Sequence, residues 1–307
     1  MDYFFSFNKY LKEQFNDRLW RIPLSTGYPC PNRLNGKTGC TFCNETSFIP
    51  RYLKDDDTLD NQIERGIKFF SKRYKVNNFY GYFQYNTSTF GPVDELIAKY
   101  EKVLSLECMK GLIISTRPDY ITIEIVDKIN NLYYKYKKDI WIELGLQSIY
   151  DRTLSRINRG HTYDDFKIAN KLIKESENIK TSIHIIIGLP GETEKMIEEG
   201  IAKLFKENKI DGIKFRLLEI LPNTLMEDDF NNNSDDFLKF TFDSYCKLLA
   251  RLIEVIPENV VIMRLVNFKS LEILSNGQKN ISKREVLEAI NRELEGRGSR
   301  QGALYKL

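Results

Sequence analysis

The chain has 307 residues, of which 42% are hydrophobic and 12% aromatic, enough to form the core of one large domain or two small ones. Its 46 basic and 43 acidic residues leave a net charge of only +3, which argues against a histone-like protein and restricts nucleic-acid binding to a local patch. No apolar run approaches the ~18 to 20 residues of a membrane span, and the first residues lack a signal-peptide pattern, so we expect a cytoplasmic protein without membrane partners.

Short apolar runs alternate with longer amphipathic stretches along the first two thirds of the chain. This alternation is typical of repeated βα units around a parallel sheet. Helix-start patterns follow several runs, as in Pro92-Val93-Asp94-Glu95 and Glu192-Thr193-Glu194. The predicted strands are Trp20–Ser25, Phe79–Gln84, Gly111–Thr116, Ile140–Gly145, Thr181–Gly188 and Gly212–Leu218.

Six βα units are too few for an ordinary eight-stranded barrel. We therefore expect an α/β fold with a partial (βα)6 TIM-like barrel, its site at the carboxyl ends of the strands, and a C-terminal helical and strand extension. A polar loop around 227–236, a helix over 237–255, a strand at 260–263 and a helix over 282–294 are predicted for that extension. The expected divisions are 1–19 as an N-terminal extension, 20–226 as the core and 227–307 as the C-terminal region.

Three of the five cysteines follow the first predicted strand, at Cys30, Cys40 and Cys43. An odd number crowded in this way indicates metal chemistry in a reducing compartment rather than a disulfide framework. Three thiolates suit iron–sulfur or zinc, but structural zinc needs a fourth ligand, and Cys108, Cys246 and the two histidines are all distant in sequence. A four-iron cluster on three cysteines leaves one iron open for a small molecule. Purely structural or zinc-bound cysteines are the alternative.

With its later motifs, the chain resembles radical S-adenosylmethionine (SAM) enzymes, and more narrowly the YhcC/YtqA-type subfamily related to the radical SAM core of the elongator catalytic subunit. The resemblance covers about Cys30 to Glu192, with weaker matches to Leu218 and near the tail. The matching stretches beyond the cysteines are Tyr82–Thr87, Ser115–Asp119, Glu143–Ser148, Asn158–His161, Gly188–Glu192 and Arg297–Gly302.

The resemblance implies that Cys30, Cys40 and Cys43 hold a 4Fe–4S cluster. Once reduced by a donor such as flavodoxin or ferredoxin, the cluster would cleave bound SAM, and the resulting radical would abstract a substrate hydrogen. Cys108 and Cys246 are predicted to be dispensable for iron.

The same resemblance implies a set of SAM-binding side chains. Phe42 would lie against the adenine, Gln147 and His184 would reach the ribose, and Arg159 would pair with the carboxylate. Each has an ordinary structural alternative: loop packing for Phe42, a polar network for Gln147 and a satisfied core position for His184. The remaining predicted SAM contacts are Gln84, Thr87 and Ser115, of which Gln84 and Thr87 stand where many relatives bind the methionine amino group.

Charged residues also occur on predicted strands. Glu143 faces substrate or orients the SAM-binding residues, because a carboxylate on an apolar strand needs a partner. Lys214 and Arg216 alternate along the sixth strand, where they either bind an anionic substrate group or form salt bridges with Glu143 or Glu219. We expect His161 to position its loop rather than to bind metal.

The substrate implied by the resemblance is a tRNA wobble-uridine side chain. The stretches 68–75 and 133–138 interleave cations with aromatics and are either RNA-binding surfaces or ordinary solvated helix ends. The tail 296–300 is either an RNA contact or frayed. Segments 214–224 and 263–268 depart from the subfamily pattern where substrate would be recognised. A radical SAM enzyme acting on a small metabolite or peptide, and a non-catalytic zinc-dependent RNA-binding module, are the alternatives.

Overall fold

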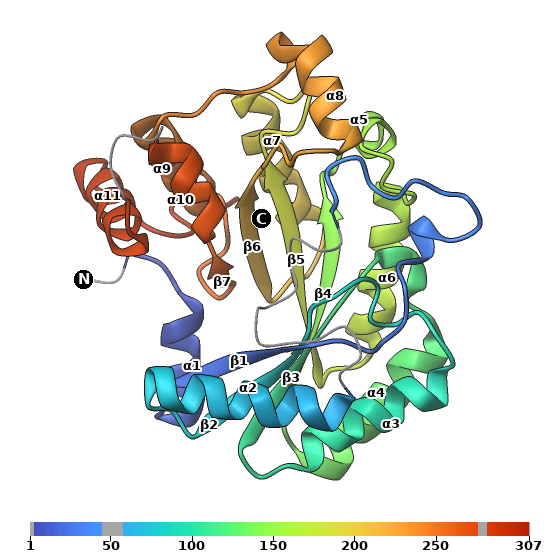
Figure 1. Ribbon diagram of the computed structural model, residues 1–307. Coiled ribbons are helices and arrows are strands. Elements are labelled where there is room, and N and C mark those ends of the chain that lie inside the picture. Colours follow the sequence, from blue (N-terminus) through green and yellow to red (C-terminus); the bar gives the residue numbers. More distant parts are fainter. Residues whose placement is uncertain (1–2, 45–57, 276–280, 307) are drawn as a thin grey trace.

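Seven parallel strands form a single curled sheet in the computed structural model, which describes residues 3–44, 58–275 and 281–306 (Figure 1). The strands neighbour one another in chain order, so β1 and β7 are the two edges of the sheet. Each strand prediction is confirmed, including the seventh strand. The strands are β1 (Leu19–Leu24), β2 (Asn78–Phe83), β3 (Met109–Thr116), β4 (Asp139–Gln147), β5 (Ile179–Ile187), β6 (Gly212–Leu217) and β7 (Val261–Arg264).

Amphipathic helices cover the outer face of this sheet (Figure 1). Their apolar sides pack on strand residues such as Leu112, Ile142 and Ile183, all completely buried. Threonine hydroxyls begin several of them by accepting a backbone hydrogen bond from the first turn, which satisfies a donor that the helix leaves unpaired. These helices are α2 (Leu59–Tyr74), α3 (Val93–Ser105), α4 (Ile123–Tyr136), the short α5 (Asp151–Arg156), α6 (Tyr163–Glu175) and α7 (Glu194–Glu207).

The N-terminal helix α1 (Phe7–Phe15) closes the inside of the curl near the amino ends of the strands. Phe7 and Tyr10 pack edge-on against the indole of Trp141. One carboxylate oxygen of Asp139, at the start of β4, accepts hydrogen bonds from the hydroxyls of Tyr10 and Tyr80 at 2.6 Å each and from the Trp141 indole at 2.7 Å. With this end filled, the carboxyl ends of the strands are left to form the site.

The prediction of a loop over 227–236 is wrong. Helix α8 (Leu225–Asn232) occupies most of it, followed by a 3-10 turn at Ser234–Asp236. The Thr224 hydroxyl accepts from the backbone N–H of Glu227, and the acids in the first turn favour the positive end of the helix dipole. Arg156 then ties Asp229 and Asp236 to the body at 2.9 and 2.7 Å. A polar, asparagine-rich sequence therefore forms a surface helix held by ion pairs.

The C-terminal helices α9 (Phe242–Glu254), α10 (Phe268–Ser275) and α11 (Lys283–Gly296) lie beside β6 and β7 (Figure 1). The first and last confirm predicted helices, although α9 begins five residues later than expected because Thr241 caps it. Across the described part of the chain, no helix combines the length and apolar character needed to span a bilayer.

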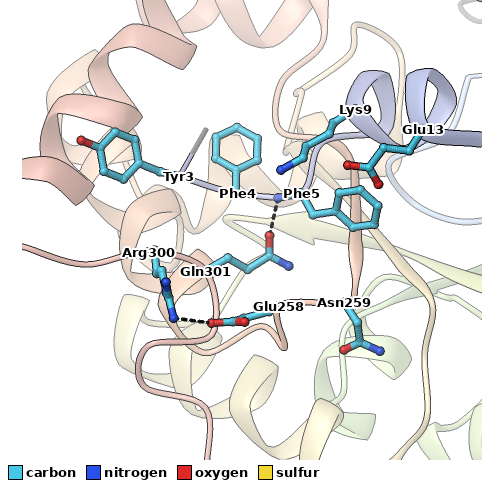
Figure 2. Close-up of a pocket in the computed structure, with 9 residues that line it drawn as sticks. All are labelled: Tyr3, Phe4, Phe5, Lys9, Glu13, Glu258, Asn259, Arg300 and Gln301. Carbon is cyan, nitrogen blue, oxygen red and sulfur yellow. Dashed lines mark hydrogen bonds and ion pairs between the residues drawn. The ribbon is translucent and has the colours of Figure 1, made fainter. Parts of the chain in front are cut away.

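The tail after α11 is folded against the body rather than frayed (Figure 2). Gln301, only 3% exposed, accepts from the backbone N–H of Phe5 at 2.7 Å and donates to the carbonyls of Pro257 and Val260 at 2.7 and 2.8 Å. One side chain thus joins the N-terminal segment to the turn before β7. These segments surround an open hollow of about 390 Å³ (Figure 2).

Candidate active site

The loop after β1 carries the three predicted cluster cysteines, and all three line one cavity. A 3-10 turn, Pro31–Arg33, reverses the chain directly after Cys30. The Arg33 guanidinium then donates to the carbonyls of Thr38 and Cys43 at 3.2 and 2.5 Å. Gly39 has a left-handed backbone, and a Cβ there would meet the Arg33 side chain at 2.8 Å, so glycine is required for this fold of the loop.

Two asparagines, for which the sequence predicted no role, fasten this loop to the segment after α5. The Asn158 side chain donates to the carbonyl of Gly39 at 2.6 Å, and the backbone N–H of Thr41 donates to Ile157 at 3.0 Å. The Asn32 side chain in turn donates a hydrogen bond to the carbonyl of Asn158 at 2.8 Å. Asparagines flanking the cysteine and Arg159 motifs were the sequence indication of this contact.

Every predicted site residue lines the same cavity at the carboxyl ends of the strands. Besides the cysteines, these are Phe42, Gln84, Thr87, Ser115, Gln147, Arg159 and His184. The Phe42 ring also packs on the apolar cluster that includes Met226 and Phe237, so loop packing and cavity lining apply to it together. Residues from β2 to β7, together with the loop that follows β1, thus meet at one mouth, as the barrel prediction required.

Arg159 connects the cysteine loop to the end of β4. Its guanidinium donates twice to the carbonyl of Gly145, at 2.7 and 3.1 Å, and once to the Cys40 sulfur at 3.4 Å. A Cβ on Gly145 would lie 2.6 Å from that guanidinium. His161 also contacts the Gly145 carbonyl, at 3.2 Å, and burial beside Arg159 lowers its pKa to about 4, so the ring is neutral and holds the loop as expected.

Several buried polar atoms of cavity-lining residues have no hydrogen-bond partner among the described residues. They include Thr87 Oγ1, Gln147 Oε1, His184 Nε2, Arg117 Nη1 and the second carboxylate oxygen of Glu143. Gln147 also holds a left-handed backbone with φ of 74°, which is unusual for a residue other than glycine or asparagine. Burial and the cations Lys214 and Arg216 lower the pKa of His184 well below its ordinary value, so its ring is neutral. Buried groups of this kind need a partner, which a bound ligand would provide.

An ionic cluster lies deeper in the cavity wall. Lys214 donates to Glu143 at 2.8 Å and to the Tyr82 hydroxyl at 2.8 Å, and Tyr82 donates to Glu143 at 2.6 Å. Ser115 donates to the same carboxylate oxygen at 3.3 Å. Of the two alternatives for Lys214 and Arg216, the structure has the salt bridges, since Arg216 pairs with Glu219 at 2.7 Å.

Burial lowers the pKa of Lys214 to about 7, although Glu143 opposes that shift. The pKa of Glu143 is lowered, because Lys214, Tyr82 and Arg264 together outweigh the cost of burial. Tyr82 has a pKa well above its ordinary value, through burial and the neighbouring carboxylate.

Residues 27–204 match the radical SAM superfamily model, and residues 210–296 match the radical SAM C-terminal domain. The chain is 34% identical to YtqA of Bacillus subtilis, an uncharacterized protein, over 97% of this chain and 92% of YtqA. The chain belongs to the radical SAM superfamily. Its likeness to the YtqA type confirms the suspected subfamily.

Two further similarities of this radical SAM chain are more remote. Over 97 residues it is 36% identical to a tRNA uridine(34) acetyltransferase of Methanocaldococcus infernus, a match that covers 32% of this chain and 16% of that protein. The solved structure of an archaeal Elp3 from Methanocaldococcus infernus superposes with a TM-score of 0.62 at 17% identity, covering 92% of this chain and 64% of that one. The second similarity shows a common fold, which confirms the predicted half-barrel.

Radical SAM enzymes use a 4Fe–4S cluster and SAM and need a reductant. The types of side chain in the cavity suit both groups. Three thiols line it, and the unpartnered polar atoms of Thr87, Gln147 and His184 belong to other residues that line it. Within the described ranges, no group of three or more His, Cys, Asp or Glu is placed to hold a metal ion, and this includes Cys30, Cys40 and Cys43.

Two cations near the cavity of this radical SAM enzyme were not predicted from the sequence as site residues. Arg264, at the end of β7, lines the cavity, and Arg21 on β1 lies under it, stacked on the rings of Phe7 and Tyr82 at 5.0 and 5.9 Å. The sequence indication was a lone arginine in each of two apolar strands.

The two basic and aromatic stretches lie elsewhere. They end α2 and α4 and so lead into the amino ends of β2 and β4, opposite the mouth. Lys135 pairs with Glu101 at 2.5 Å, and Lys138 donates to two carbonyls at the end of α3 at 2.7 Å each. In the stretch 133–138, these lysines therefore support the ordinary helix-end alternative.

Proposed function

We propose that this radical SAM enzyme binds its cluster through Cys30, Cys40 and Cys43 and modifies a uridine side chain in tRNA. The observation that supports the site is that every predicted cluster and SAM residue lines one cavity at the carboxyl ends of the strands. The residues assigned to SAM are Phe42, Gln84, Thr87, Ser115, Gln147, Arg159 and His184.

When bound and reduced, by a donor such as flavodoxin or ferredoxin, the cluster would supply one electron to SAM and so start hydrogen abstraction. The chain itself orients and shields the reactants. Gln147 and Thr87 offer buried oxygens to hydroxyl or ammonium donors, and neutral His184 offers a ring nitrogen. Arg159 donates a hydrogen bond to the Cys40 sulfur, and its planar guanidinium is a cation suited to binding a carboxylate.

The tRNA proposal is supported by the partial similarity to a tRNA uridine(34) acetyltransferase and by the fold shared with archaeal Elp3. A small metabolite is the second candidate. The placement of the two basic stretches at the amino ends of the strands favours it, because a nucleic acid bound there would not reach the mouth.

Iron and sulfide analysis of anaerobically reconstituted protein tests the site. We expect four irons and a visible absorption band in the wild type, loss of iron in Cys40→Ala and full iron in Cys246→Ala, which truncates a cysteine of α9. One zinc per chain without iron, or iron loss in Cys246→Ala, would contradict the assignment.

Comparison of tRNA nucleosides from cells with and without the gene tests the substrate. We expect one modified uridine to disappear in the absence of the enzyme. Binding of tRNA should also weaken steeply with added salt, because phosphate contacts release counterions. An unchanged nucleoside profile would reject tRNA and leave the radical chemistry standing.

A further inference from the structure

Three cations from three different strands gather on one side of the cavity. Lys214 of β6 and Arg264 of β7 are direct partners in the sheet register, and Arg21 comes from β1 at the opposite edge. Arg264 acts electrostatically on both Arg21 and Lys214 and lowers the pKa of each, after burial. The curl of the half-barrel thus places like charges from its two edges near one another. This arrangement is unfavourable without a compensating anion.

The carboxylates of the described residues compensate only part of this charge. Glu143 is the one acid that acts on both Arg21 and Lys214, and it is bonded to Lys214. Glu219, the next acid along the wall, pairs with Arg216 and accepts from Asn267 at 2.7 Å. Glu143 therefore offsets only part of the positive charge of Arg21, Lys214 and Arg264, and Lys283 adds to that charge, since Arg264 and Arg21 both act on it.

The two arginines are also short of hydrogen-bond acceptors. Nη1 of Arg21 is buried without a partner among the described residues. Arg264 makes no hydrogen bond or ion pair within the described ranges, although its side chain lines the cavity beside Lys214, Arg216 and Asn267. A guanidinium carries five N–H donors in a fixed fork, so both side chains have donors left for a ligand.

We propose that Arg264 binds a phosphate group of the substrate inside the cavity, with Arg21 acting from behind as a positioning charge. A phosphate can offset more of this positive charge than a single carboxylate can, and a guanidinium fork binds phosphate oxygens in pairs. This inference rests on the proposed function, because it places the substrate in the same cavity as SAM. The phosphate belongs either to a nucleotide of RNA or to a small phosphorylated metabolite.

Calorimetric titration of the reconstituted enzyme with SAM present tests the proposal. The probes are inorganic phosphate, uridine 5′-monophosphate and a short single-stranded RNA containing uridine. The variants are Arg264→Gln, Arg264→Lys and Arg21→Gln, with Arg292→Gln as the control, since Arg292 is exposed on α11.

We expect Arg264→Gln to weaken binding of at least one probe by about tenfold or more, Arg264→Lys to weaken it less, and Arg292→Gln to leave it unchanged. Tight binding of the monophosphate alone would assign the phosphate to a metabolite, and tight binding of the RNA would assign it to a nucleotide chain. Equal affinity of Arg264→Gln and wild type, or no binding of any probe by the wild type, would overturn the inference.

Iron content and SAM affinity, measured on the same samples, separate the two proposals. With Arg264→Gln we expect four irons and unchanged SAM affinity. If this variant loses SAM rather than phosphate, Arg264 contacts SAM and the inference is overturned, whereas the cluster assignment stands. If the wild type holds no cluster, the proposed function fails whatever the phosphate result.

Discussion

Gly145 decides how closely Arg159 approaches the end of β4. The glycine carbonyl accepts two hydrogen bonds from Arg159, and the missing side chain leaves the space that this guanidinium occupies. A Cβ at this position would also lie 3.0 Å from the amide nitrogen of Gln147. The absence of a side chain at Gly145 thus allows Arg159 and Gln147, two proposed SAM contacts, to keep their positions.

Substitution Gly145→Ala should therefore weaken SAM binding by about tenfold or more, because it displaces a charge-assisted contact. Equilibrium dialysis of the anaerobic holoenzyme measures this affinity. Gly296→Ala is the matched control, since nothing lies within 4 Å of a Cβ there and its position ends a helix. Equal SAM affinity in wild type and Gly145→Ala would show that Arg159 does not position the cofactor.

The location of a single site residue could be predicted where that residue belongs to a sequence motif. The cysteines and the residues around Arg159 have fixed neighbours in sequence, so their shared cavity followed from placing each at a strand end. Arg264 and Arg21 were not predictable in this way, because their significance depends on the two edges of the sheet coming together across 243 residues of chain.

Strands β4 and β6 are joined in the interior by Glu143 and Lys214 although β5 separates them in the sheet. Their side chains cross the inside of the curl, which shields the pair from water. Both are at most 5% exposed, so the pair responds to pH more strongly than a surface pair would.

Burial places the pKa of Lys214 at about 7 in the folded protein, whereas lysine in an unfolded chain titrates near ~10.4. Between these values the unfolded chain binds more protons. The free energy of unfolding should therefore rise with pH from about 7 to about 10, by up to about 1.4 kcal/mol per pH unit, relative to Lys214→Met/Glu143→Gln.

Urea unfolding at a series of pH values measures this difference. The exposed pair Lys195 and Glu199 provides the control, since Lys195→Met/Glu199→Gln should give a profile parallel to wild type. A buried-pair variant that also runs parallel to wild type would show that Lys214 titrates normally.

Elements with strong apolar periodicity were predictable, and α8 was not. Its sequence is polar and rich in asparagine and aspartate, which individually favour turns. The helix forms because Thr224 caps it and Arg156, from the distant α5, holds Asp229 and Asp236. Such support comes from tertiary contacts that local composition does not reveal.

The two terminal segments of the chain contact each other beside β7. Gln301 bonds to Phe5, Pro257 and Val260, and the backbone of Ile262 in β7 donates to the carbonyl of Phe5 at 2.8 Å. The N-terminal segment is thereby fixed beside β7, where α1 fills the curl. Neighbouring Arg300 is by contrast exposed and pairs with exposed Glu258 (Figure 2).

Gln301→Ala should lower the free energy of unfolding by about 2 to 4 kcal/mol, because it leaves buried backbone groups without partners. Arg300→Ala should change it by less than about 0.5 kcal/mol, as is usual for an exposed ion pair. Denaturant titrations of both variants check the contrast. Equal losses would mean that Gln301 does not join the two ends.

The sequence by itself determined the strands, most of the helices, the cysteine loop and the family, because these depend on local periodicity and short motifs. The divisions at residues 19 and 226 stay predictions. Only the tertiary structure decided which charges pair, that α1 fills the curl and that Arg21 meets Arg264. Those outcomes depend on contacts between residues far apart in the chain, and neither composition nor spacing specifies which partners the curled sheet brings together.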